Sequence, residues 1–83
     1  DMLIVKPASL YLDIIQKANS SSLIPIVAYQ VSGEYSMIKV SAKNNLINLD
    51  SAIFESLISM KRAGATLIIS YFADYIADKL NKI

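Results

Sequence analysis

Three short apolar runs, separated by segments of helical periodicity, constrain the fold of this chain more than any other feature. The runs are "MLIV" at 2–5, "IPIVAY" at 24–29 and "TLIISY" at 66–71. Each is rich in β-branched residues, and none alternates apolar with polar side chains. Continuous apolar runs of this length are typical of strands buried on both faces, as in parallel sheets. We therefore predict three buried strands.

The segment 9–19 between the first two runs has the periodicity of a helix. One side of that helix is polar, and the other carries Leu10, Tyr11, Ile14, Ile15 and Ala18. We expect "NSSS" at 19–22 to end the helix. Pro25 follows, and proline is tolerated in the first residues of a strand.

Two helices are predicted between the second and third runs. The first is "SGEYSMIKVSAKNN", with Ser32 or Gly33 as its N-cap and Glu34 in its first turn, where the helix dipole favours a carboxylate. The second has Asp50 as its N-cap. Its predicted buried stripe consists of Ile53, Phe54, Leu57 and Ile58.

Gly64 fits the position after the last turn of this second helix, where a left-handed backbone is common. The basic pair Lys61 and Arg62 precedes it and favours a helix C-terminus. A closing helix is expected from about Asp74 to Asn81. Its predicted inward residues are Ile76, Ala77 and Leu80.

This order of strands and helices predicts α/β architecture with right-handed parallel crossovers. Three strands cannot close a barrel, and 54% hydrophobic residues with a mean hydropathy of +0.44 is high for 83 residues. With no initiator methionine at Asp1, we expect residues 1–83 to be a C-terminal fragment of a single catalytic domain. That fragment would supply the last three βα units of a (β/α)8 TIM barrel. A small doubly wound domain is the alternative.

Composition narrows the possible chemistry. The chain has no cysteine and no histidine, which removes thiolate, imidazole and the usual zinc ligands from this segment. A net charge of +1, without basic clusters beyond one pair, favours neither nucleic acid nor an anionic membrane. The longest apolar runs are far shorter than the roughly 20 residues that span a bilayer. Any chemistry must come from an amine, a hydroxyl, a phenol or a carboxylate.

Polar residues follow all three runs, at the strand ends where α/β proteins bind ligands. They are Lys6 after the first run, Tyr29, Gln30 and Ser32 after the second, and Ser70 and Tyr71 after the third. Each has an ordinary explanation, because strands must end and Ser32 also fits a helix cap. Together they favour one shared site.

Lys6 is the residue with the most distinctive chemistry in this set. A poorly hydrated barrel mouth disfavours an ammonium ion, and the neutral amine can attack a ketone to form an imine. Pro7 restricts the backbone of Lys6 and would help to aim its side chain. Ser32 and Gly33 at a helix start offer donors for an anion, and Tyr71 adds a phenol. An amine beside carboxylate-binding donors suggests a keto acid as substrate.

Four segments, "DMLIVKP", "AYQVSGEY", "ESLISMKRAGA" and "LIISYF", closely resemble the C-terminal portion of the 5-aminolevulinate dehydratase family, also called porphobilinogen synthase. The resemblance covers essentially the whole chain. It implies a (β/α)8 barrel, usually assembled as a homo-octamer. It also implies a lyase that condenses two 5-aminolevulinate molecules to porphobilinogen in haem biosynthesis. We expect a cytoplasmic protein with no nucleic-acid or membrane partner.

The resemblance also implies roles for individual residues. Lys6 stands where the family forms a Schiff base with one substrate molecule. Ser32 and Tyr71 match hydroxyls that hold the carboxylate of that substrate, and Tyr29 matches an aromatic wall beside the imine. Glu34, Tyr35, Lys61 and Arg62 are given helix and packing roles.

Other parts of the family's machinery have no counterpart in these 83 residues. The second active-site lysine, the residues that bind the second substrate, the lid and the metal ligands all precede the matched region in the family. We therefore expect no cofactor within this segment, zinc or magnesium in the full-length protein, and no turnover by the segment alone. A non-catalytic fragment that folds by docking on a partner, and a different lysine-imine barrel such as an aldolase, remain alternatives.

Overall fold

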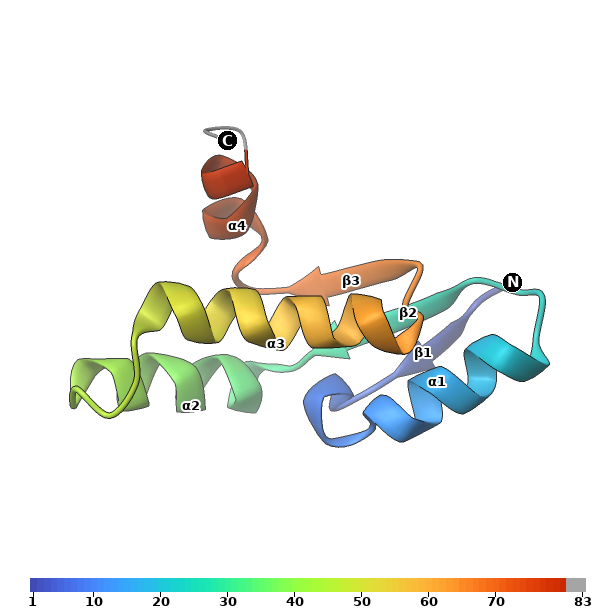
Figure 1. The fold of residues 1–83 in the computed structure, drawn as a ribbon, viewed down its shortest axis with the longest axis horizontal. Coiled ribbons are helices and arrows are strands. Elements are labelled where there is room, and N and C mark those ends of the chain that lie inside the picture. Colours follow the sequence, from blue (N-terminus) through green and yellow to red (C-terminus); the bar gives the residue numbers. More distant parts are fainter. Residues whose placement is uncertain (81–83) are drawn as a thin grey trace.

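The computed structural model describes residues 1–80 and is a small α/β structure with a parallel sheet (Figure 1). Its elements are β1 (Leu3–Val5), the 3₁₀ helix η1 (Ala8–Leu10), α1 (Leu12–Ser21), β2 (Ile26–Gln30), α2 (Ser32–Lys43), α3 (Leu49–Ala63), β3 (Leu67–Ser70) and α4 (Ala73–Leu80). The predicted α/β class and the three strands are confirmed. The three strands and four α-helices of the described residues correspond to part of a barrel and do not form a closed barrel.

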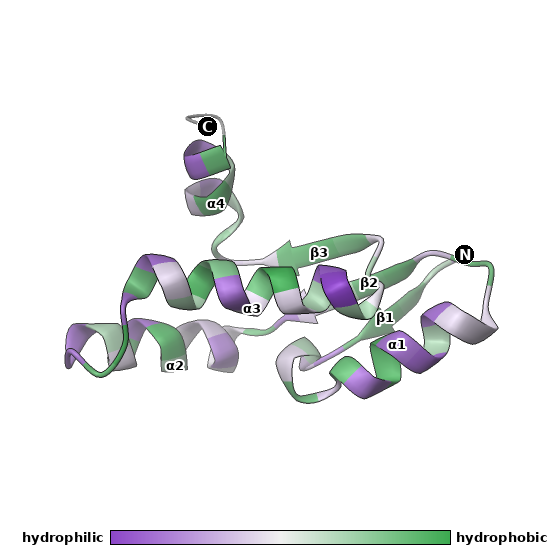
Figure 2. Cartoon of the chain, in the orientation of Figure 1, coloured by the Kyte–Doolittle hydropathy of each residue, from purple (hydrophilic) through white to green (hydrophobic). Residues whose placement is uncertain are grey.

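The sheet has the order β1-β2-β3, with both pairs parallel. Ile4 pairs with Val27, and Val27 pairs with Leu67. All three strands are strongly hydrophobic, as Figure 2 shows. The central strand β2 is almost entirely buried, whereas β1 and β3 are partly exposed.

Helices cover one face of this sheet. Its core packs Val5, Ile26 and Ala28 of the strands against Ile15 of α1 and Met60 of α3. The shortest extent of the chain is 17 Å, which accommodates one sheet and one layer of helices.

The opposite face has no covering layer within residues 1–80. Successive strand residues point to opposite faces, so Ile4, Val27 and Leu67 form a row across this open face. Val27 is 2% exposed because it lies between the other two, but Ile4 is 56% and Leu67 is 54% exposed. The expectation of burial on both faces is therefore wrong for β1 and β3 in this chain, because nothing in these residues packs on that side.

The serines that were expected to end α1 are part of it. Ser20 Oγ donates to the carbonyl of Gln16, and Ser21 Oγ donates to the carbonyl of Lys17. Hydroxyls that bond back to the preceding turn can be accommodated in the last turn of a helix. The helix consequently extends to Ser21 rather than stopping at Asn19.

The caps of α2 and α3 also differ from the prediction. The N-cap of α2 is Val31, whose N–H is bound by the Glu34 carboxylate, so neither Ser32 nor Gly33 is the cap. The N-cap of α3 is Asn48, whose Oδ1 accepts from the Ser51 N–H at 3.0 Å. Asp50 lies inside the first turn instead. In α2 the Glu34 carboxylate accepts from the N–H of the cap residue, and in α3 the cap side chain accepts from an N–H of the first turn.

Gly64 ends α3 as predicted, with a φ of 120°. A Cβ at this position would lie 2.6 Å from the side-chain nitrogen of Asn19 in α1. The glycine therefore serves both the positive φ and the close approach of two helices. Of the predicted stripe of α3, Ile53 and Leu57 are buried, but Ile58 is 46% exposed.

The closing helix α4 rises away from the sheet and the other helices (Figure 1). Ile76 is half-buried, while Ala77 and Leu80 are exposed, so the prediction that these two face inward is wrong. An open groove of about 350 Å³ separates α4 from α3 and β3, and Leu80 lines it. Asn81, the predicted end of the helix, lies outside the described residues.

Candidate active site

The carboxyl ends of the three strands lie along one edge of the sheet, because the strands are parallel. Lys6 directly follows β1, Tyr29 is the fourth residue of β2, and Tyr71 directly follows β3. Since Val5 pairs with Ala28, Lys6 is level with Tyr29. Strand alternation directs Tyr29 to the open face that also carries Ile4, and Lys6 begins the connection after β1.

Lys6 is exposed in this chain. The peptide bond between Lys6 and Pro7 is cis, and the chain then enters η1, where Ala8 is fully buried. The poorly hydrated barrel mouth expected around the amine is not formed by residues 1–80 themselves. The reason is geometric, because three strands supply only part of a barrel wall.

Tyr29 and Tyr71 come together at this edge. They line an open hollow of about 200 Å³ with Ile69 and Ser70. A hydrogen bond with the Tyr29 side chain, followed by electrostatic interaction with the same phenol and slight desolvation, raises the pKa of Tyr71 above its ordinary value. Like any tyrosine of ordinary or raised pKa, Tyr71 keeps its proton at neutral pH and can donate a hydrogen bond.

Ser32 is the first residue of α2 and is exposed, but it does not line this hollow. The neighbour that the sequence did not assign to the site is Tyr35 of α2. Its ring lies 5.5 Å from the Tyr71 ring and 4.6 Å from the Phe72 ring, centroid to centroid. Tyr35 thereby joins the start of α2 to the end of β3, which is consistent with the packing role expected for it.

Gln30 and Ser70 are expected at the same rim as Tyr29 and Tyr71, but Gln30 belongs to the helix-covered face, and Ser70, although it borders the hollow, uses its hydroxyl in contacts with Gln30 and Phe72. Gln30 is fully buried and its Nε2 donates to Ser56 Oγ of α3 at 3.1 Å. Ser70 Oγ donates to Gln30 Oε1 at 2.5 Å and accepts from the Phe72 N–H. These contacts satisfy a buried amide and join β2, β3 and α3, so they are structural.

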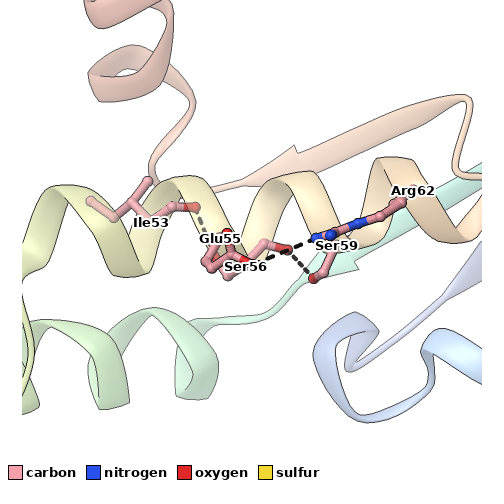
Figure 3. A network of polar contacts seen from close by, with 5 residues as sticks. All are labelled: Ile53, Glu55, Ser56, Ser59 and Arg62. Carbon is pink, nitrogen blue, oxygen red and sulfur yellow. Dashed lines mark hydrogen bonds and ion pairs between the residues drawn. The ribbon is translucent and has the colours of Figure 1, made fainter.

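Ser56 continues into a polar network along α3 (Figure 3). Its hydroxyl donates to the Ile53 carbonyl, and Ser59 Oγ donates to the Ser56 carbonyl. Arg62 pairs with Glu55 at 3.5 Å, and both side chains are largely exposed. This ion pair lies on the helix surface, away from the strand ends, in agreement with a helix role for Arg62.

A metal ion has no evident place in the described part of the chain. Residues 1–80 contain no group of three or more aspartate, glutamate, histidine or cysteine side chains that could hold one. The donor set at the strand ends consists instead of one amine, two phenols and one hydroxyl. This set suits imine chemistry and carboxylate binding.

None of the helices within residues 1–80 combines the length and the apolar character that crossing a membrane requires.

Almost the whole chain is similar in sequence to known proteins. A family model described as delta-aminolevulinic acid dehydratase matches residues 1–79. A delta-aminolevulinic acid dehydratase from Staphylococcus aureus (strain Mu50 / ATCC 700699) is 51% identical over 82 residues, and one from Staphylococcus epidermidis is 54% identical over 82 residues. Each alignment covers 99% of this chain and 25% of the relative, so the chain spans about a quarter of their length.

A solved structure has the same local fold. It is a crystal structure of delta-aminolevulinic acid dehydratase (porphobilinogen synthase) from Toxoplasma gondii ME49 in complex with the reaction product porphobilinogen. The TM-score is 0.91 at 44% sequence identity, with 94% of this chain and 22% of that chain covered.

Proposed function

The chain belongs to the delta-aminolevulinic acid dehydratase family, and we propose that it is the C-terminal part of a single (β/α)8 domain with porphobilinogen synthase activity. In this proposal the full-length protein, a chain of the relatives' length that includes these 83 residues, condenses two molecules of 5-aminolevulinate to porphobilinogen. The product bound in the Toxoplasma gondii structure supports this substrate class. The family match also favours this reaction over that of an aldolase.

We propose that Lys6 is the nucleophile. Its neutral amine adds to the ketone carbon of one 5-aminolevulinate, and a proton moves to the ketone oxygen to give a carbinolamine. Loss of water then leaves the imine. The amine must be unprotonated to attack, so the remaining strands of the barrel are needed to exclude water around it.

Ser32 and Tyr71 are proposed to hold the carboxylate of that substrate molecule, and Tyr29 to form a wall beside the imine. Tyr71 suits its part because a neutral phenol donates to a carboxylate at physiological pH. Ser32 lies at the N-terminus of α2, where free N–H groups also favour an anion.

One observation carries this proposal. Lys6 and Tyr71 directly follow β1 and β3, and Tyr29 lies near the end of β2, so the three residues gather at one end of a parallel sheet, where Tyr29 and Tyr71 line one hollow. An imine-forming amine and the donors for the same substrate must meet at one end of the sheet in this way.

The other participants lie outside these residues. We assign the second substrate site, the zinc or magnesium ligands and the remaining strands to other segments of the full-length protein. Its assembly as a homo-octamer and its cytoplasmic location are proposed from the family. The segment alone would hold at most one half of a substrate site.

Trapping the imine tests the proposal. The full-length protein is incubated with 5-aminolevulinate and borohydride, which delivers hydride to the imine carbon and leaves a stable secondary amine. Peptide mapping by mass spectrometry should find the adduct on Lys6. The Lys6→Ala variant should lose this adduct and turnover, while Lys17→Ala, on the exposed surface of α1, should keep both. An adduct that never forms on Lys6 would rule out the assignment.

A further inference from the structure

Glu34 is a buried carboxylate to which the proposed reaction gives no task. It lies in the first turn of α2 and is only 5% exposed. Its partners within residues 1–80 are backbone N–H groups rather than a basic side chain. A buried carboxylate is costly unless its oxygens accept hydrogen bonds, so these contacts are strongly constrained.

The two oxygens of Glu34 hold two separate segments. Oε1 accepts from the Val31 N–H at 2.9 Å, and Val31 immediately precedes Ser32. Oε2 accepts from the Ser9 N–H at 2.9 Å, 25 residues away in sequence. Ser9 lies in η1, in the connection that follows Lys6. A single side chain therefore joins the segments that carry the proposed nucleophile and a proposed carboxylate donor.

We propose that Glu34 is a positioning residue that fixes the segment carrying Lys6 relative to Ser32, an inference that rests on the proposed function. Attack on a ketone requires the amine and the bound carboxylate to be held at a set separation. β1 fixes the chain before Lys6, and the Ser9–Glu34 contact fixes it three residues later. Releasing Ser9 would let the connection move while β1 stays in place.

The Glu34→Gln variant separates the two contacts. A glutamine at this position can still accept from the Val31 N–H through its amide oxygen, as in an ordinary capping box. Its amide nitrogen then faces the Ser9 N–H, so a donor opposes a donor and that contact is lost. Glu55→Gln is the matched control, because Glu55 is an exposed carboxylate on α3 whose contact is a surface ion pair with Arg62.

Two measurements on the full-length protein test the inference. The first is the single-turnover rate of borohydride trapping on Lys6 at saturating 5-aminolevulinate. Glu34→Gln should lower this rate at least about tenfold, since small displacements of reacting groups have effects of this size. The second is amide hydrogen exchange, which should become faster at Ser9 and stay slow at Val31. Glu55→Gln should change neither.

The outcomes separate a positioning role from a merely structural one. Trapping at the wild-type rate in Glu34→Gln, with faster exchange at Ser9, would overturn the inference and leave the proposed function intact. A wild-type protein that never labels Lys6 would overturn both. If Glu34→Gln does not fold, Glu34→Asp serves instead, because its shorter side chain keeps the charge but cannot span both N–H groups. Unprotected exchange at Ser9 in the wild-type protein would also refute the contact.

Discussion

At the scale of single residues, Tyr71 offers a prediction with a defined sign. The Tyr29 side chain raises the pKa of Tyr71, first through a hydrogen bond and then electrostatically. Tyr29→Phe should therefore lower the pKa of Tyr71 toward its ordinary value. A pH titration of the tyrosine ring carbons by NMR measures this, with Tyr71→Phe identifying the signal. Tyr11→Phe, which removes a different exposed tyrosine, should leave it unchanged.

The pH dependence follows from the same shift. A raised pKa means that the folded state favours the protonated phenol, so the stabilising contribution is complete below the ordinary tyrosine pKa. It is lost as the pH rises through the raised pKa. A Tyr71 titration that does not respond to Tyr29→Phe would contradict the contact.

The sequence identifies the residues whose side chains can take part in the proposed chemistry. It indicates only in part on which face of the sheet each of these side chains lies. Lys6, Tyr29, Ser32 and Tyr71 were all selected from runs of apolar residues that end in polar ones, and their roles stay predictions. The pattern of polar residues after apolar runs groups Gln30 with Tyr29, although neighbouring residues in a strand point to opposite faces. Strand alternation would have assigned Gln30 to the helix side. The contact of Glu34 with Ser9 left no signal in the sequence, because it joins segments 25 residues apart.

At the scale of elements, α3 provides a test of which residue caps a helix. Asn48→Ala should destabilise the first turn by about 1 kcal/mol, because the Ser51 N–H loses its acceptor. This corresponds to roughly fivefold faster hydrogen exchange at Ser51. Asp50→Ala should have a smaller effect, about 0.5 kcal/mol, since it removes a first-turn charge and an exposed ion pair with Lys79. A larger effect from Asp50→Ala than from Asn48→Ala would restore the cap that the sequence predicts, because alanine cannot cap a helix.

The existence and order of the elements were predictable because periodicity is a property of ten or more residues. The ends of the elements depend on single hydrogen bonds, so the sequence predicts the ends poorly. The serines that end α1 could break a helix or bond back to it, and the choice is made by local geometry. For α4 the predicted inward side is only partly covered, because Ile76 packs against the core while Leu80 lines an open groove.

At the scale of the whole molecule, the open sheet face is the dominant feature. The sequence indicated that 83 residues are too apolar to bury their own surface, and the structure shows where that surface lies. Which layer covers it cannot be read from these residues, because none of the described side chains packs on that face; in the proposed barrel the covering side chains would come from other segments. The match to a quarter of the relatives' length supplies that context.

The 83-residue chain by itself should associate through this face. Ile4, Leu67 and Ile69 are each about half exposed on it, and contiguous apolar surface of this kind promotes self-association. Sedimentation velocity should find dimers or larger species that increase with concentration. Ile69→Thr, which keeps a β-branched side chain but adds a hydroxyl, should raise the monomer fraction. Leu23→Thr should not, because Leu23 is fully exposed in the connection after α1, away from the sheet. A monomer with slow hydrogen exchange throughout β3 would mean that the open face needs no partner.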